Sequence, residues 1–336
     1  MKHTKRNSII ILLITIVFLY FLLKDNYIST FESLKNADIK WILVALVIYS
    51  IYLTFDNLVL YIIAKLYKKN IKFKYIFKLG VMTKFFNGIT PLASGGQPLQ
   101  VLELRKEKIK VEDATSIVTE NYMLFQIVLV FFALGAILLN QVFHIFTKVK
   151  MLKDLTILGF VANLVLLLFL VYVSFNKHAS TKIGNKVIDL LAKIRIVKDK
   201  KATKEKWKEK CINYHNNAMD LLKNKKVIFY GLLFYFISLL FYHSIPYFIM
   251  KSLGINVNII KIIIASCYAF IMSCYVPIPG ATGGAELCFL GIMANFLEEP
   301  ILSSTLIIWR FVTYYLPTVV GAIVFNLKKQ LPKKVE

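Results

Sequence analysis

The amino-acid sequence predicts an all-α, polytopic membrane protein with about six full spans and two re-entrant hairpins, which makes eight or more helices. Three observations support this fold class. The chain is rich in apolar residues, apolar runs long enough to cross a bilayer recur along it, and a helix-breaking motif occurs twice between such runs. We expect one integral membrane domain, 1–336, with an inverted-topology repeat and both termini in the cytoplasm.

The composition excludes an ordinary soluble domain. Of the 336 residues, 57% are hydrophobic and 26 are Phe, and the mean hydropathy is +0.63. A soluble domain of this length would have more apolar surface than its core could hold. The six predicted spans are Ser8–Leu23, Trp41–Ile63, Ala114–Leu139, Leu155–Ser174, Val227–Met250 and Ile301–Phe325.

The first of these runs is short enough to be the apolar core of a signal peptide. No small-residue cleavage site follows it, however, because the next residues are Lys24-Asp25-Asn26-Tyr27. We therefore predict a retained anchor at the N-terminus rather than a cleaved signal.

Basic residues are distributed unevenly between the predicted loops, and the formal net charge is +23. With the N-terminus in the cytoplasm, the inside segments 1–7, 64–113, 175–226 and 326–336 carry 33 of the 42 Lys and Arg residues. Cytoplasmic loops of membrane proteins carry such an excess. The asymmetry therefore predicts a multi-pass protein of the cell membrane with both ends inside.

The most basic of these segments, 175–226, contains the lysine-rich run Lys204–Lys210. We expect a helical segment in solvent or at the membrane surface, attracted to anionic lipid headgroups. RNA binding is the weaker alternative, because no zinc-finger, aromatic RNA-binding or P-loop motif accompanies the charge. The four cysteines form no C-x-x-C pair, and we expect no metal, no cofactor and no nucleic-acid partner.

A nine-residue pattern occurs twice, 188 residues apart. Pro91–Leu99 (PLASGGQPL) matches Pro279–Leu287 (PGATGGAEL) at five positions, and Ser94 aligns with Thr282. Proline and paired glycine break helices, and broken backbone is tolerated at membrane depth only where protein or a water-filled cavity satisfies its polar groups. Two such breaks in corresponding places of two halves indicate a transporter-like binding site.

The charge pattern predicts how these motifs sit in the membrane. The segment of about 76–104 has cytoplasmic flanks, so we expect a hairpin that enters and leaves on that face. The segment of about 259–296 has outside flanks and is expected to enter from the opposite face. Residues of about 41–139 and 227–325 would then form an inverted repeat. The alternative is that each hairpin arm crosses fully, which gives eight to ten spans.

The hairpin tips are candidate sites for a lipid headgroup or another anion. Glycine lets backbone approach a ligand closely, and the first N–H groups of a following helix favour negative charge. The competing interpretation is that the glycine pairs only allow tight helix packing. The candidate headgroup residues are Ser94, Gly95, Gly96, Gln97, Thr282, Gly283, Gly284 and Glu286.

Ionisable residues at membrane depth are candidates for gating or headgroup contact. Each charged side chain at the centre of a span costs about 2.5–3.5 kcal/mol, so it should face the interior and have a partner. We expect Arg310 to approach Asp56 or Glu120 in at least one state; a purely structural Asp56–Arg310 ion pair is the alternative. The candidate intramembrane polar residues are Asp56, Glu103, Glu120, His243 and Arg310.

These motifs resemble the flippase-like membrane region of the lysylphosphatidylglycerol synthase family. The resemblance rests on Thr90–Leu99, on Pro277–Glu286, and on Trp309-Arg310 with Tyr314–Pro317, and it extends over nearly the whole chain. It implies a polytopic bundle with a lipid-accessible cavity. It also implies translocation of a phospholipid or a polyprenyl-phosphate-linked headgroup, with lysylphosphatidylglycerol-type lipids as the leading candidate, in a bacterial protein connected with antimicrobial-peptide resistance.

The same resemblance implies roles for particular residues. Asp56, Glu120 and Arg310 look like the intramembrane polar residues of the family, and Glu286 lies in its glycine-rich hairpin. The synthases carry a soluble acyltransferase-like domain after the membrane region, whereas here only Asn326–Glu336 follow the last span. We therefore expect a lipid transporter rather than an enzyme.

Three functional hypotheses remain. The first is a flippase for a lipid or a lipid-linked headgroup. The second is an intramembrane enzyme acting on lipid phosphate, with Glu103, Glu120, Glu286 or His243 as acid and base, although no nucleophile–base spacing is visible. The third is a membrane subunit that partners a separate soluble synthase, which would dock on 175–226. A homodimer is compatible with each.

Overall fold

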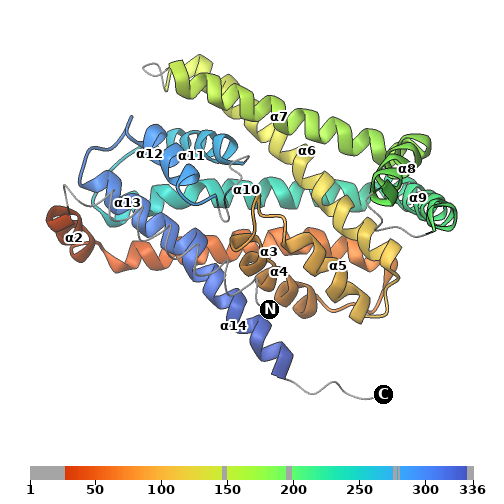
Figure 1. The fold of residues 1–336 in the computed structure, drawn as a ribbon. Coiled ribbons are helices and arrows are strands. Elements are labelled where there is room, and N and C mark those ends of the chain that lie inside the picture. The colour runs from red at the N-terminus through yellow and green to blue at the C-terminus, as the bar shows by residue number, and fades with distance from the viewer. Residues whose placement is uncertain (1–26, 146–149, 194–198, 275–277, 279–280, 331–336) are drawn as a thin grey trace.

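The computed structural model describes residues 27–145, 150–193, 199–274, 278 and 281–330, and the regular structure within them is entirely helical (Figure 1). This confirms the predicted fold class for the part of the chain that the structure describes. The predicted first span, Ser8–Leu23, lies outside the described residues. In chain order the helices are α2 (Tyr27–Lys35), α3 (Ile39–Tyr67), α4 (Phe73–Gly88), α5 (Gly96–Lys106), α6 (Val111–Phe143), α7 (Lys150–Phe175), α8 (Lys177–Lys193), α9 (Lys200–Lys223), α10 (Lys225–Ser252), α11 (Ile259–Ser273), α12 (Gly284–Met293), α13 (Ile301–Arg310), the π-helical turn η1 (Phe311–Tyr315) and α14 (Leu316–Gln330).

Five helices among the described residues are long and apolar enough to cross a membrane. Each of them contains or largely covers one predicted span. They are Ile39–Tyr67, Val111–Phe143, Asp154–Phe175, Lys225–Ser252 and Ile301–Leu327.

Side-chain caps explain where several helices begin. The Asp38 carboxylate accepts a hydrogen bond from the backbone N–H of Lys40 at the start of α3, at 2.9 Å. Asn258 accepts from the N–H of Ile260 at the start of α11, also at 2.9 Å. Such caps satisfy N–H groups that the first turn of a helix leaves without a partner.

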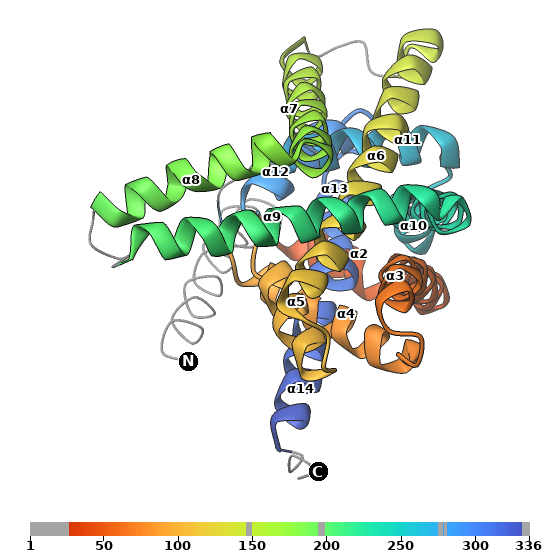
Figure 2. The ribbon, with the colours of Figure 1, turned by 90° about the vertical axis from the view of Figure 1, so that its right-hand side faces the viewer.

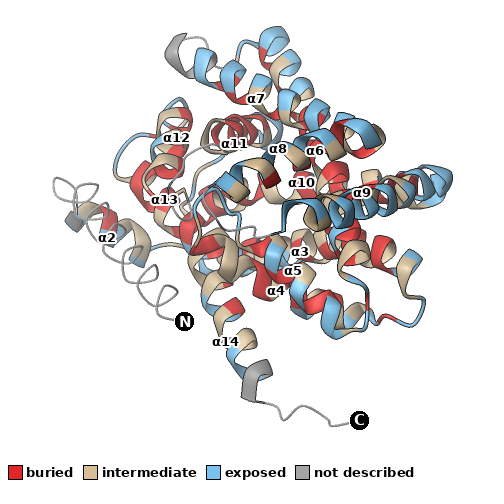
Figure 3. Ribbon diagram, turned by 45° about the vertical axis from the view of Figure 1, so that its right-hand side comes forward, coloured by how far each residue is buried: buried red, intermediate tan, exposed pale blue. Residues whose placement is uncertain are grey.

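The centre of the fold is an antiparallel pair formed by α3 and α10. Trp41, near the start of α3, stacks on Phe248 near the end of α10, with ring centroids 6.2 Å apart. Phe55, further along α3, meets Phe234 at 5.6 Å. Because the two helices run in opposite directions, the segments that follow them start from opposite ends of the pair (Figure 1). Buried residues concentrate around this pair and α4, whereas α9 is largely exposed (Figure 3).

Two helix–break–helix units follow the ends of this pair: α4 with α5, and α11 with α12. Their helices have 16, 11, 15 and 10 residues. At 1.5 Å per residue these lengths are about 15–24 Å, shorter than a hydrocarbon core of about 30 Å. The lengths favour the re-entrant hairpin over arms that cross fully.

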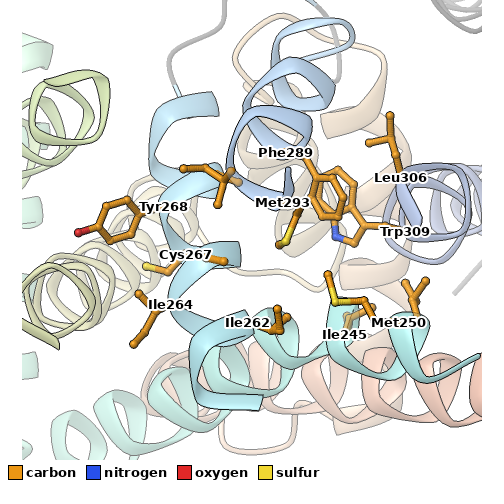
Figure 4. Close-up of a cluster of buried hydrophobic side chains, with 14 of the residues drawn as sticks. Ile245, Met250, Ile262, Ile264, Cys267, Tyr268, Phe289, Met293, Leu306 and Trp309 are labelled. Atoms are coloured by element: carbon orange, nitrogen blue, oxygen red, sulfur yellow. The ribbon is translucent and has the colours of Figure 1, made fainter. Parts of the chain in front are cut away.

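The second hairpin packs on α10 and α13 through one apolar cluster (Figure 4). Ile245 of α10, Cys267 of α11, Phe289 of α12 and Trp309 of α13 are all buried members of it. The rings of Phe289 and Trp309 stack with centroids 4.4 Å apart. This packing fixes α12 against the span that carries Arg310.

The two halves share the same order of elements. A long helix, two short helices and a second long segment occur in α3–α6 and again in α10–α14. The first residue of α12, Gly284, lies 188 positions after Gly96, the first residue of α5. The superposition of the halves and their membrane sidedness stay predictions.

The predicted sidedness can be tested in loops at the two ends of the pair. Lys108 follows the first hairpin and Asn256 precedes the second, and both are exposed. A membrane-impermeant maleimide should label Asn256→Cys in intact cells and Lys108→Cys only after permeabilisation. Lys69→Cys, before the first hairpin, is the control and should label like Lys108→Cys. Labelling of both hairpin loops from one side would contradict the inverted arrangement.

Candidate functional site

A cavity of about 310 Å³ lies between the two hairpins. Leu92 and Ala93 from the first break line it, as do Ala281 and Ala285 from the second. The remaining walls come from α3, α4, α6, α10, α11 and the last span, which contributes Arg310. The two motifs that the sequence singled out therefore meet at one cavity.

Arg310 forms a buried ion pair with Glu286 of the second hairpin. Its Nη2 lies 2.6 Å from Glu286 Oε2, and the two side chains are only 7% and 3% exposed. The same carboxylate oxygen accepts a hydrogen bond from the N–H of Gly283 at 2.7 Å. The guanidinium carbon lies 5.1 Å from the ring centroids of both Trp309 and Tyr314. Carboxylate and aromatic faces together offset the cost of burying this cation.

Several buried donors at this place lack a hydrogen-bond acceptor among the described residues. They are Nε and Nη2 of Arg310 and Nε1 of Trp309. Arg310 and Glu286 thus form an ion pair through the proximity of Nη2 and Oε2, but the N–H group is not aligned with the oxygen as in a good hydrogen bond. An unsatisfied buried donor costs about 1–3 kcal/mol, so an oxygen-rich ligand in the cavity would be stabilised there.

A second ion pair lies at the same cavity. Lys84, from α4 in the first hairpin, places Nζ 3.0 Å from Asp56 Oδ2 of α3. It also donates a hydrogen bond to the Tyr52 hydroxyl at 2.8 Å and lies 4.8 Å from the centroid of that ring. The sequence-based candidates did not include Lys84. The available signal was a single lysine among the apolar residues of Leu79–Ile89.

The backbone of the glycine pairs is already engaged within the protein. The N–H of Gly95 donates to Thr90 Oγ1, and the N–H of Gly96 donates to Asn87 Oδ1, each at 2.8 Å. The N–H of Gly283 is taken by Glu286. In this structure these three groups do not form the expected backbone cradle for an anion. The positively charged donors at the cavity are instead the side chains of Arg310 and Lys84.

A π-helical turn directly after Arg310 links the last span to the first hairpin. In η1 the helical hydrogen-bond pattern widens, a feature that often occurs at functional sites. Tyr314 in this turn donates a hydrogen bond from its hydroxyl to the backbone carbonyl of Gly88 at 3.0 Å. One tyrosine thus contacts both the buried guanidinium and the other hairpin.

The remaining tip residues do not line the cavity. Ser94 is exposed, and its hydroxyl donates to the carbonyl of Pro91 at 2.8 Å. Gln97 is half-buried in the first turn of α5, Thr282 is buried, and Gly284 is the first residue of α12.

Three candidates lie away from the two ion pairs at the cavity. Glu103 is paired with Lys106 at 2.6 Å. Glu120 accepts a hydrogen bond from the Tyr67 hydroxyl at 2.8 Å. His243 is buried beside the cavity-lining helices, where its Nδ1 lies 3.0 Å from Ser266 Oγ. The partner of Arg310 in this structure is therefore Glu286 rather than Asp56 or Glu120.

Within the described residues, no group of three or more His, Cys, Asp or Glu side chains could hold a metal ion. The fold and the cavity define a multi-pass helical membrane protein in which two broken hairpins enclose a cavity with one buried and one partly buried ion pair. The chain matches the lysylphosphatidylglycerol synthase TM region over residues 8–321, and it belongs to this family. It is also 25% identical over 264 residues to a UPF0104 membrane protein of Archaeoglobus fulgidus, an alignment that covers 76% of each chain.

Removal of one member of the Arg310–Glu286 pair should be strongly destabilising. Arg310→Ala and Glu286→Ala should each cost about 3–5 kcal/mol, because each leaves an uncompensated buried charge. The double variant should cost clearly less than the sum. The free energy of unfolding in detergent should be measured for the two single variants and the double variant. The exposed pair Lys223–Asp220 is the control, with an expected cost below about 1 kcal/mol. Additive losses at the buried pair would contradict the interpretation.

Gly96 should be intolerant of a side chain for reasons of packing. A Cβ there would collide with Asn87, which also accepts the Gly96 N–H, and with Thr83. Gly96→Ala should therefore lower the melting temperature and expression. Gly135→Ala is the matched control, because a Cβ at that helical position meets nothing within 4 Å and alanine favours helix by up to about 1 kcal/mol. Equal melting temperatures for both variants would contradict the close approach.

Proposed function

We propose that this protein translocates a lipid with a phosphate-containing headgroup between the leaflets of the cell membrane. The substrate would be a phospholipid or a polyprenyl-phosphate-linked lipid, with lysylphosphatidylglycerol-type lipids as the leading candidate. The observation that carries the proposal is the cavity between the hairpins, where the buried Arg310 and the partly buried Lys84 each lie beside a carboxylate. Membership of the lysylphosphatidylglycerol synthase TM family supports a lipid-related role.

The cations suit a phosphate. A guanidinium has five N–H donors, and Glu286 occupies only part of this capacity in the structure. Hydrogen bonds from guanidinium or ammonium groups to phosphate are about twice as strong as neutral ones. A phosphate in the cavity would thus find donors that are buried without an acceptor.

The balance of charges suits a headgroup that also carries an amine. Two carboxylates, of Glu286 and Asp56, accompany the two cations. When a phosphate binds Arg310 or Lys84, either carboxylate becomes available to an ammonium group. This exchange of partners favours an aminoacylated phospholipid over one with only negative charge.

The arrangement of the hairpins suits transport between leaflets. They start from opposite ends of the α3–α10 pair and meet at one cavity, so one site can be reached from two sides by movement of either hairpin. We propose that the first hairpin faces the cytoplasm, as the charge pattern predicts. The enzymatic alternative has less support, because its candidates Glu103, Glu120 and His243 do not line this cavity and the fourth, Glu286, is paired with Arg310.

The decisive experiment is lipid movement in liposomes that contain only the purified protein. Labelled phosphatidylcholine, phosphatidylglycerol, lysylphosphatidylglycerol and a polyprenyl phosphate should be compared, with chemical analysis of the lipids afterwards. Movement of an intact lipid supports the proposal, whereas a changed lipid indicates an enzyme. No movement of any of the four would overturn it and would favour a subunit that needs a synthase partner.

Arg310→Ala should lower the transport rate about 10- to 100-fold, because it removes charge-assisted hydrogen bonds worth about 1.5–3 kcal/mol. The variant should still insert into the membrane. Lys261→Ala is the control, since it removes an exposed positive charge outside the cavity. Normal transport by Arg310→Ala, with only a lower melting temperature, would show that the pair is structural.

A further inference from the structure

The basic segment forms a helical hairpin that is attached directly to two spans. Only Asn176 separates the end of α7 from the start of α8, and only Asn224 separates the end of α9 from the start of α10. The Asn176 side chain caps α8 by accepting from the N–H of Ala179 at 3.0 Å. Because α7 and α10 are long enough to cross the bilayer, these links place the base of the hairpin where the spans leave the membrane.

The hairpin runs across the spans rather than along them. In Figure 1, α7 and α10 are seen at full length while α8 and α9 are foreshortened at one end of the bundle. In Figure 2 the relation is reversed, and α8 and α9 extend sideways beyond the bundle. Both helices therefore lie near the plane of the membrane surface.

Close packing makes the hairpin one unit. Gly184 of α8 lies directly against the Trp207 ring of α9, and Trp207 Nε1 donates to the carbonyl of Ser180 at 3.3 Å. Asp189 of α8 forms ion pairs with Lys204 at 2.7 Å and Lys200 at 2.9 Å. Hydrogen bonds from these two lysines hold the pKa of the Asp189 carboxyl below its ordinary value.

One stripe of α8 remains apolar and exposed. Ile183, Val187 and Leu190 are 38%, 50% and 61% exposed. Their spacing places them within about 60° of arc on the helix, at 100° per residue. The adjacent strip carries Lys182, Lys186 and Lys193, which lie about 60–100° around the helix from Ile183, all on the same side. An apolar stripe flanked by lysines is typical of a helix that lies in a membrane interface.

We propose that α8 is an in-plane anchor on an anionic leaflet. Its apolar stripe enters the boundary between headgroups and acyl chains, and the neighbouring lysines contact lipid phosphates. The basis is the combination of three features: the single-residue links to the spans, the orientation across them, and the charge beside the stripe. This inference concerns a surface separate from the cavity and does not depend on the transported lipid.

A fluorophore on the stripe of the full-length chain tests the proposal. Val187→Cys, labelled with an environment-sensitive dye, is placed in nanodiscs with either neutral or partly anionic phospholipid. In anionic discs its emission should shift to the blue and be quenched by lipids with a shallow nitroxide. The chain without the new cysteine, taken through the same labelling, gives the background of the native thiols. Glu209→Cys on the exposed face of α9 is the control and should report water.

The charge contribution has its own test. Lys182→Gln, Lys186→Gln and Lys193→Gln together, like high salt, should reduce the quenching at position 187 to the level seen in neutral discs. Water-like emission at position 187 in anionic discs would overturn the proposal and leave the stripe free for a protein partner. Emission that depends on the protein-to-lipid ratio would overturn it in favour of a second copy. Equal quenching in both lipids would overturn the role of the lysines.

Discussion

Burial of the Arg310 guanidinium is the constraint on which the cavity depends. A cation in low dielectric needs a nearby carboxylate and further polar or aromatic contacts. Glu286 supplies the carboxylate, and its position follows from the break before α12, because the same oxygen also caps Gly283. The aromatic contacts come from Trp309 and Tyr314, which belong to the same span. The second hairpin, the last span and the ion pair are therefore parts of one arrangement.

The first hairpin is built on the same requirement with different residues. Lys84 replaces the guanidinium, Asp56 supplies the carboxylate from α3, and Tyr52 supplies both a hydroxyl and a ring. Tyr314 then joins the two hairpins by its hydrogen bond to Gly88. Each cation has an acid and an aromatic group beside it, so the charges of the two pairs balance. In the proposed function, that balance lets a charged headgroup exchange partners with the protein instead of adding charge to it.

Hydropathy located the spans well, because membrane crossing depends on the summed transfer of many side chains. It placed their ends less well. The predicted span Ala114–Leu139 begins three residues later than α6 itself, which starts at Val111. The first turn of α6 contains Glu112 and Asp113. These acids stabilise a helix start through the backbone dipole although they lower the hydropathy. The paired glycines predicted the breaks, but their hydrogen bonds to Thr90 and Asn87 depend on side-chain positions that spacing does not encode. The pairing of Arg310 with Glu286 likewise required the packing of α12 on α13.

The one-residue connections at Asn176 and Asn224 couple the movement of two spans to that of the helices outside them. No flexible linker separates α7 from α8 or α9 from α10. The helix joined to α10 is α9, whose 24 residues make it about 36 Å long, so a tilt of about 10° at its base would move its tip by about 6 Å. The helix α10 also contributes to the wall of the cavity. A tilt of that span would therefore produce a larger displacement at the far end of α9. With the proposed anchor in place, resistance of the membrane surface to that movement would in turn restrain α10.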